Sequence, residues 1–424
     1  MAACKHLEGS PPAVPRLLQS DVEGPKVDYI SALPDCVLSC ILSMISMKDM
    51  MKTSILSKRW CNLWHLRRNL KFDAHNMLGN GRIMSSHDER NEFVKRVNQF
   101  LKNYKGTKID SFMVDFELNY EPSSTIDEWI RFAIARGVGR IELLTPSYYK
   151  FPFGLSFEGK DPTLKHMHLR RCIICDPGTW FGRFWRMETK ENCHPATNID
   201  LFTFTNLRSL KIEGSTVDVN LLTTLLSNCL LLEELSLISS SINSSSLKIE
   251  SSSLCHLKIE ELFCSKKKIE EDLDDHHYHR HLKFISLDCP KLTYFYFDNT
   301  ISGSLSMNAP ILKTIEYIVS SHAEKIHDAF ALFAKLPKLE TLNLYINKNT
   351  FEVTPLQGIQ TLENLRQFNL SIDATYEDFD IWWILPILQA SPFLQKLSVT
   401  QRGSLYIETL EAGRLAQQAY LNKP

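Results

Sequence analysis

The stretches LRSLKI (residues 207–212) and LEELSL (residues 232–237) decide the fold of this 424-residue chain. Each has an apolar residue at its first, fourth and sixth positions, and the pattern returns in LCHLKI (residues 254–259). Because alternate residues of a strand point to the same side, the last two apolar residues of each stretch face one side of a short strand. The pattern therefore predicts a repeated strand that buries one face.

The same pattern occurs eleven times along the chain. Eight of the ten intervals between successive copies span 20–29 residues, which is the period of leucine-rich repeats. No copy can bury its apolar face alone, so the strands are expected to stack into a curved parallel sheet, with connecting segments on the convex side and loop insertions in the two longer intervals. The copies begin at Ile109, Val138, Leu164, Leu207, Leu232, Leu254, Leu292, Leu312, Leu339, Leu365 and Leu394.

The front of the chain follows a helical spacing instead. Pro34 suits a first helical turn, and two further short helices are predicted for residues 48–56 and from Lys58 onward. So small a unit exposes more apolar surface than it can cover, which indicates that it leans on a neighbour or a partner. The apolar residues of the first helix are Leu33, Val37, Leu38, Ile41, Leu42 and Ile45.

The order of motifs in residues 28–73 resembles an F-box of the plant type. Cys36 stands where an acidic residue is common, and residues 45–47 replace the usual Leu-Pro-Thr turn. With the repeats behind it, the chain resembles plant F-box/leucine-rich-repeat proteins, including the F-box/FBD/LRR type, from residue 28 to about 400. The F-box resemblance rests on Leu33-Pro34-Asp35, Val37-Leu38, Ile41-Leu42, Thr53-Ser54, Leu56-Ser57-Lys58-Arg59-Trp60, Leu63-Trp64 and Leu70-Lys71-Phe72-Asp73.

The expected fold class is α/β: an N-terminal three-helix F-box followed by a leucine-rich-repeat solenoid with a curved parallel sheet. Phe93, Val97, Phe100 and Leu101 predict an amphipathic helix that covers the first repeat. The predicted domains are a disordered tail (1–27), the F-box (28–73), a linker with the capping helix (74–106), the solenoid (107–400) and a divergent C-terminal cap or tail (401–424).

The resemblance implies a substrate-recognition subunit of an SCF-type cullin-RING ubiquitin ligase. In that role the F-box docks a SKP-type adaptor and through it a cullin, the repeats bind a protein substrate, and the chain has no catalytic residue. The alternative is a non-catalytic interaction scaffold with a drifted F-box and no ligase role. The predicted adaptor-binding residues are Leu33, Pro34, Val37, Leu38, Ile41, Leu42, Leu56 and Trp60.

Substrate binding is assigned to the concave face, where polar residues alternate with the inward apolar pair. Any half-buried strand has such a solvated polar face, but tyrosine is enriched at interface hot spots, which favours the tyrosines here. A small ligand on this face has no residue signature in the sequence. The predicted substrate-binding residues are Tyr294, Tyr296, Tyr345, His256, Lys258 and Lys211.

Enzyme, metal and nucleic-acid roles find little support. A formal charge of −1 supplies no broad positive field, and no phosphate-binding glycine loop or G-x-S-x-G elbow occurs. Cys172 of the CxxC at 172–175 falls where a leucine-rich repeat places a side chain that bonds the backbone, so a structural role is expected. The histidines and aspartates of residues 274–281 are possible metal ligands, but adjacent ligands on a loop lack a fixed geometry. No metal or cofactor is expected.

The chain is expected to act in the nucleus, the cytoplasm or both. Its first 27 residues lack the apolar run of a secretory signal, and its longest apolar stretches fall short of a membrane span. Eleven scattered cysteines are an odd number and fit reduced thiols better than a disulfide framework.

Overall fold

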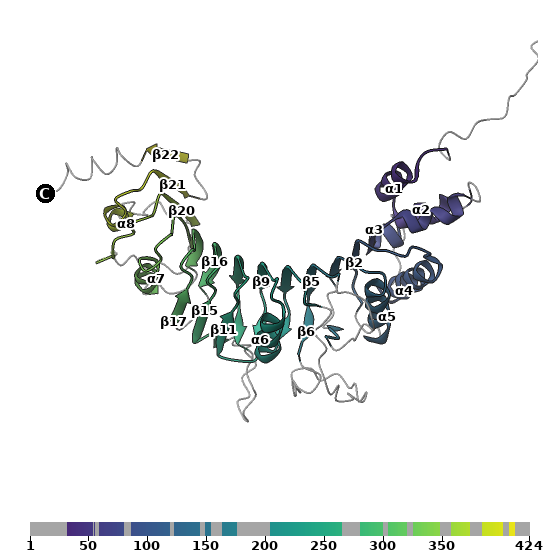
Figure 1. Ribbon diagram of the computed structural model, residues 1–424, viewed down its shortest axis with the longest axis horizontal. Helices are drawn as coiled ribbons and strands as arrows, with labels where there is room; N and C mark the ends of the chain where they lie inside the picture. The colour runs from purple at the N-terminus through teal and green to yellow at the C-terminus, as the bar shows by residue number, and fades with distance from the viewer. Residues whose placement is uncertain are drawn as a thin grey trace, which may run out of the picture.

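The computed structural model confirms the predicted fold class: a small helical module precedes a curved, mainly parallel sheet (Figure 1). The predicted disordered tail lies outside the described residues, as do residues 412–424 and most of the histidine-rich loop. The structure describes residues 32–53, 55, 59–79, 86–118, 123–144, 149–153, 163–175, 204–264, 280–299, 304–319, 325–347, 358–373, 384–401 and 407–411.

A sheet of 13 strands lines the inner side of the arc in Figure 1. Neighbouring strands pair in parallel and in register, except that the last strand is antiparallel to the one before it. Its strands are, in spatial order, β1 (Asn69–Asp73), β2 (Ser111–Asp115), β3 (Arg140–Leu143), β5 (His166–Arg170), β7 (Ser209–Glu213), β9 (Glu234–Ile238), β12 (His256–Glu260), β16 (Tyr294–Asn299), β18 (Thr314–Val319), β19 (Thr341–Asn347), β20 (Gln367–Asp373), β21 (Lys396–Gln401) and β22 (Ile407–Glu411).

The outer side of the arc carries helices and two smaller sheets (Figure 1). The helices are α5 (Ser123–Ile134), α6 (Val219–Asn228), α7 (Lys325–Phe333) and α8 (Leu385–Ala390). One sheet comprises β4 (Tyr149–Lys150), β6 (Cys172–Ile174), β8 (Thr216–Val217), β10 (Ser241–Ile242), β13 (Phe263–Cys264) and β14 (Arg280–His281), and the other comprises β11 (Ser246–Glu250), β15 (Phe284–Asp288) and β17 (Ser304–Asn308).

The core is a continuous apolar layer behind the inner sheet. Of the 33 apolar positions in the eleven copies, all are buried except Leu394 and Val399, which are half-buried in the last copy. Equivalent residues lie beside each other: Leu210 pairs with Leu235, and Leu235 with Leu257. Each repeat therefore covers the side chains of its neighbours, as the sequence predicts.

β1 is a twelfth copy that the sequence pattern misses. Leu70 and Phe72 pair with Phe112 and Val114 of β2, and all four side chains are buried. The first position of this copy is occupied by Arg67, which is also buried. The segment assigned to the end of the F-box is thus the first strand of the solenoid sheet.

In four successive repeats, the chain turns out of the inner sheet at a residue whose backbone has a left-handed conformation, with positive φ. These residues are Arg171, Gly214, Ser239 and Glu261, with φ of 54°, 56°, 46° and 48°. This conformation costs a non-glycine residue about 1–2 kcal/mol of free energy. The backbone N–H groups of Arg171, Gly214 and Ser239 each donate to a carbonyl of the next repeat at 2.8 Å, so hydrogen bonding continues around the corner.

The residue after each corner ties neighbouring repeats together. Ser215 Oγ accepts from the Cys172 backbone N–H (3.0 Å) and donates to the Glu213 carbonyl (2.9 Å). Ser240 Oγ in turn accepts from the Ser215 N–H at 3.2 Å. Cys172 is buried at the same position, and burial raises the pKa of its thiol to about 12.

Replacing Ser215 with Ala should lower the free energy of unfolding by about 1–3 kcal/mol, because the buried Cys172 N–H loses its acceptor. The measurement is the urea midpoint of the full chain. Ser209→Ala, on the concave side of the same repeat, is the control and should change stability by no more than about 0.5 kcal/mol. Equal midpoints for the two variants would contradict the structural role of Ser215.

Candidate functional site: the front module and the concave face

The front module is held together by a small core of its own. It contains α1 (Asp35–Met44), α2 (Met47–Thr53) and a 3₁₀ helix, η1 (Trp60–Leu66), in place of the third α-helix that the sequence predicts. Pro34 precedes α1 and its carbonyl accepts the Leu38 N–H at 3.1 Å. The side chains that fill the core are Leu38, Leu42, Met47, Met50, Trp60 and Leu63.

Arg67 is the polar centre of this module. Its Nη1 donates to the carbonyls of Leu42 (2.8 Å) and Ile45 (2.6 Å), and its Nε donates to the Asn69 carbonyl (3.2 Å). A cation at the C-terminal end of a helix satisfies carbonyls that have no partner within the helix. Arg67 therefore holds the end of α1 against the start of β1.

Beside its buried residues Leu38 and Leu42, α1 exposes a row of apolar side chains. Pro34, Val37, Ile41 and Met44 recur at intervals of three or four residues, and we call this set the α1 stripe. Val37 is 39% exposed and Met44 is 85% exposed. Ile55, beyond the end of α2, is 86% exposed. Contiguous exposed apolar residues of this kind are typical of protein-binding surfaces.

The structure separates the predicted adaptor-binding residues into two groups. Pro34 and Val37 are exposed, and Leu33 and Ile41 are half-buried, so all four reach the surface. The side chains that we correct are Leu38, Leu42 and Trp60, which pack inside the module and leave no surface for a direct contact. Leu56 lies outside the described residues.

Sequence reasoning missed Met44 and Ile55 as surface residues. Met44 continues the spacing of Val37 and Ile41, and this spacing is the signal that could have found it. Ile55 lies beyond the last turn of α2, where a helical pattern gives no direction for its side chain.

The second tryptophan of the module belongs to its junction with the solenoid. Trp64 stacks on Phe100 of α4 (Ser86–Asn103), with ring centroids 5.9 Å apart. Phe100 also meets the edge of Phe72 in β1 at 5.5 Å, and the Tyr104 hydroxyl donates to the Arg67 carbonyl at 2.8 Å. Burial raises the pKa of Tyr104 to about 12, so this donor keeps its proton at physiological pH. α4 therefore packs against both η1 and β1.

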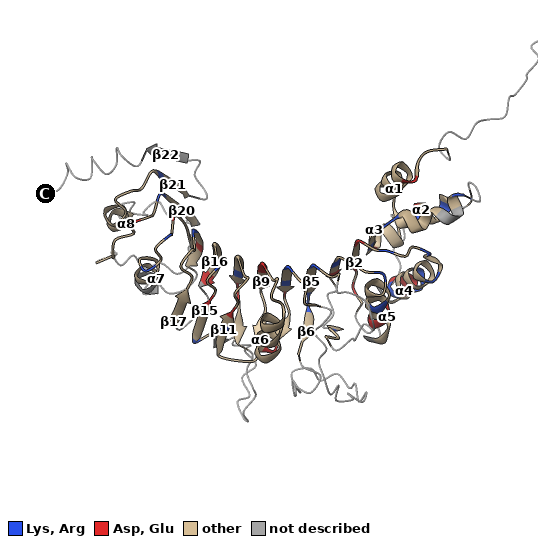
Figure 2. Cartoon of the chain, viewed as in Figure 1, with Lys and Arg blue, Asp and Glu red and all other residues tan. Residues whose placement is uncertain are grey.

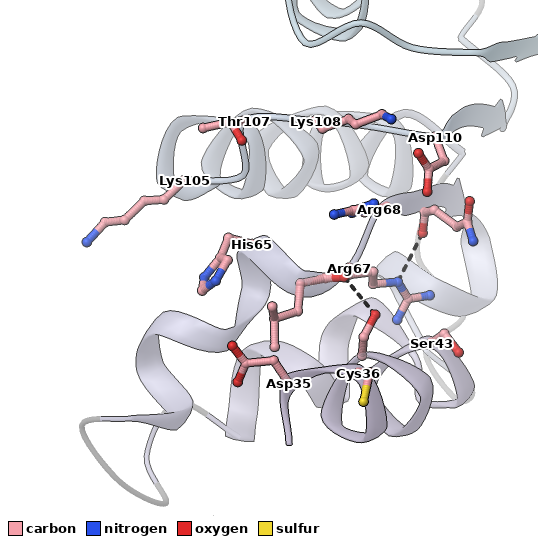
Figure 3. A pocket seen from close by; sticks show the side chains of 13 residues that line it. Asp35, Cys36, Ser43, His65, Arg67, Arg68, Lys105, Thr107, Lys108 and Asp110 are labelled. Atoms are coloured by element: carbon pink, nitrogen blue, oxygen red, sulfur yellow. Dashed lines mark hydrogen bonds between the residues drawn. The ribbon is translucent and has the colours of Figure 1, made fainter. Parts of the chain in front are cut away.

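A polar groove runs beside this junction (Figure 3). It has a volume of about 600 Å³ and lies between α1 and the segment that leads into β2. Asp35, Cys36 and Ser43 line one wall, and Lys105 and Lys108 line the other. The groove contains charges of both signs, so its lining does not define one class of ligand.

The concave face brings five of the six predicted substrate-binding residues together. His256 and Lys258 lie on β12, Tyr294 and Tyr296 on the adjacent β16, and Tyr345 on β19. The rings of His256 and Tyr294 are 5.9 Å apart, and Lys258 Nζ lies 4.1 Å from the centroid of the Tyr296 ring. Their side chains therefore form one aromatic and polar cluster.

Lys211 lies apart from this cluster, on β7. Its Nζ is 3.0 Å from Glu213 Oε2, and His168 Nε2 is 3.2 Å from the same oxygen. Burial acts to raise the pKa of Glu213, but these neighbours hold it below its usual value. Burial and the Lys211 charge lower the pKa of His168. The ammonium group of Lys211 is thus already paired with a carboxylate of the same strand.

Glu316 is the concave residue that sequence reasoning overlooked. It lies on β18 between Tyr296 and Asn343, and Asn343 Nδ2 donates to its carboxylate at 3.3 Å. The alternation between Ile315 and Tyr317 is the signal that could have found it.

The described part of the chain offers no cluster of metal ligands and no helix long and apolar enough to cross a membrane. The histidine cluster at 276–279 lies outside it, and only the backbone of His281 falls within it.

A small helical module with an exposed apolar stripe, joined to a leucine-rich-repeat arc, defines a class of F-box/leucine-rich-repeat proteins. Residues 30–72 match the F-box domain, and residues 100–411 match the family described as At1g61320/AtMIF1, LRR domain. The second match spans most of the chain, so the chain belongs to this leucine-rich-repeat family and carries an F-box before it.

Relatives from Arabidopsis thaliana share this arrangement. F-box/FBD/LRR-repeat protein At4g00160 is 26% identical over 382 residues, which cover 88% of this chain and 72% of that protein. F-box/LRR-repeat protein 13 is 27% identical over 377 residues, covering 86% and 70%. F-box/LRR-repeat protein At3g26922 is 33% identical over a shorter stretch of 156 residues, covering 36% and 47%. The resemblance to plant F-box/leucine-rich-repeat proteins is confirmed.

Replacing Arg67 with Met should destabilise the front module by about 1–3 kcal/mol, because two carbonyls at the end of α1 lose their donor. The urea dependence of tryptophan fluorescence measures this loss. Arg68→Met removes the exposed neighbouring arginine and should change stability by about 0.5 kcal/mol or less. An Arg67 variant as stable as the Arg68 variant would show that Arg67 does not hold α1.

Proposed function

We propose that this protein is the substrate-recognition subunit of an SCF-type ubiquitin ligase. The F-box would dock a SKP-type adaptor and through it a cullin, and the concave face would bind a protein substrate. The observation that supports this proposal most directly is the α1 stripe on an F-box module, which presents apolar side chains to solvent at helical spacing.

The adaptor surface in this proposal consists of Leu33, Pro34, Val37, Ile41 and Met44. Leu38, Leu42 and Trp60 support this surface from below, because their packing fixes the direction of α1. The chain contributes no catalytic residue. It would act by holding the substrate near the ubiquitin-charged enzyme, which raises the local concentration of one reactant near the other.

The proposal places this activity in the nucleus or the cytoplasm. Eight cysteines have described side chains, and none of these eight takes part in a disulfide. Free thiols fit a compartment with a reducing environment.

Replacing Val37 and Met44 together with Asp should reduce capture of a SKP-type adaptor at least tenfold, because full burial of one such side chain contributes about 1.5–3 kcal/mol. The measurement is co-purification of the adaptor after co-expression, followed by titration. Leu230→Asp is the matched control, since Leu230 is 66% exposed on the solenoid, far from the module in sequence.

Two outcomes contradict parts of this proposal. A double variant that binds the adaptor as well as the unmodified chain would remove the α1 stripe from the interface. If the unmodified chain captures no adaptor, the interaction scaffold with a drifted F-box becomes the better account.

A further inference from the structure

The pairing of charged side chains on the concave face changes at β16. Up to β12 several of its carboxylates lie beside cations of this chain: Lys211 Nζ is 3.0 Å from Glu213, and Lys258 Nζ is 2.7 Å from Glu260. Arg170 likewise lies 3.3 Å from Asp115. Both signs of charge are visible along the inner edge of the arc in Figure 2. In this part of the face, the negative charges are therefore largely neutralised by cations of the same chain.

From β16 to β20 the balance is different. The described side chains on the concave side of these strands include two carboxylates, Asp298 and Glu316, and no lysine or arginine. Glu316 is half-buried and has no ion pair with any described residue. A carboxylate that has lost part of its hydration without gaining a cation is a favourable place for a cation from another molecule.

The groups around Glu316 suit a cationic guest. Asn343 Nδ2 donates a hydrogen bond to its carboxylate at 3.3 Å, and Tyr294 lies on the neighbouring strand β16. Burial, together with the charge of Glu316, raises the pKa of Tyr294 to about 12 and also raises the pKa of Tyr345. Glu316 therefore lies close to two neutral tyrosines, and Tyr345 is 37% exposed.

The adjacent strand pair shows that aromatic rings on this face accept cations. Lys258 Nζ lies 4.1 Å from the ring centroid of Tyr296, within the range of a cation–π contact. That lysine is already paired with Glu260, so it does not neutralise Glu316. Tyr294 on β16 and Tyr345 on β19 offer comparable rings on opposite sides of β18, the strand that carries Glu316.

Side-chain amides continue the surface beyond this point. Asn369 Nδ2 donates to Asn343 Oδ1 at 2.6 Å, and Gln367 Nε2 donates to Asn369 Oδ1 at 3.2 Å. Amide groups both donate and accept hydrogen bonds, so a row of them beside a carboxylate suits a polypeptide with a backbone and a charged side chain.

We propose that Glu316, Tyr294 and Tyr345 bind an arginine or lysine side chain of the protein that the concave face recognises. The inference rests on the proposed function in that the guest is a substrate segment. The carboxylate would pair with the guanidinium or ammonium group, and the tyrosine rings would contact its positive face. The amides of Asn343 and Asn369 would contact the neighbouring backbone.

The test begins with selection of a randomised 12-residue peptide display library on the purified full chain. We expect the enriched peptides to share one Arg or Lys. Replacing that Arg with citrulline, or that Lys with norleucine, should weaken binding at least tenfold, as measured by fluorescence anisotropy. Glu316→Gln should weaken binding of the charged peptide tenfold or more, and binding of its neutral counterpart less than twofold.

Glu142→Gln is the matched control. This carboxylate also lies on the concave face, on β3, 3.6 Å from Arg140, and its loss should leave the affinity within twofold. The thermal midpoints of both variants should equal that of the unmodified chain, so that a folding defect is not read as lost binding.

The proposal is contradicted if the selection yields no binder, if the binders lack a shared basic residue, or if Glu316→Gln weakens charged and neutral peptides equally. These failures are separate from failure of the ligase role. Glu316→Gln should still capture the adaptor, and a chain that prefers basic peptides but captures no adaptor would contradict only the proposed ligase role.

Discussion

The apolar face of each repeat can be buried only by the next repeat, and the whole molecule follows from this constraint. It explains why the inner strands stay parallel and in register, since any slip would move a row of leucines to the wrong side. It also makes the two ends of the stack critical. The sheet ends at the front in β1, which continues from the helical module, and at the back in the antiparallel β22.

The closure at the front joins the helical module and the solenoid in one body. β1 continues directly from the F-box module and pairs with β2, while Trp64 and Phe100 stack across the junction. Arg67 bonds the end of α1 on one side and, through its own carbonyl, accepts from Tyr104 on the other. An adaptor on α1 and a substrate on the concave face would therefore be held in a fixed relation, which a positional mechanism requires.

Most of the solenoid could be predicted from the sequence, because its strands obey a local rule of alternation at a regular period. β1 could not, because its first apolar position is taken by Arg67, whose burial depends on carbonyls from α1 that the pattern does not reveal. The convex strands are only two to five residues long, too short to be recognised by periodicity.

The candidate site was less predictable. Helical spacing marks Val37 and Leu38 equally as apolar, and only the packing of α1 within the module decides that Leu38 faces inward. On the concave face the alternation rule locates Tyr294 and Tyr345, but the lack of an ion pair between Glu316 and any described cation depends on the alignment of neighbouring strands.

Hydrogen–deuterium exchange of the amides in β1 tests most directly the claim that module and solenoid share one core. The account predicts that those amides of β1 that donate to β2 exchange as slowly as the amides of residues 112–114 in β2, because the two strands form one ladder. Rapid exchange in β1 alongside a protected β2 would show that the module is tethered to the solenoid and not built into it.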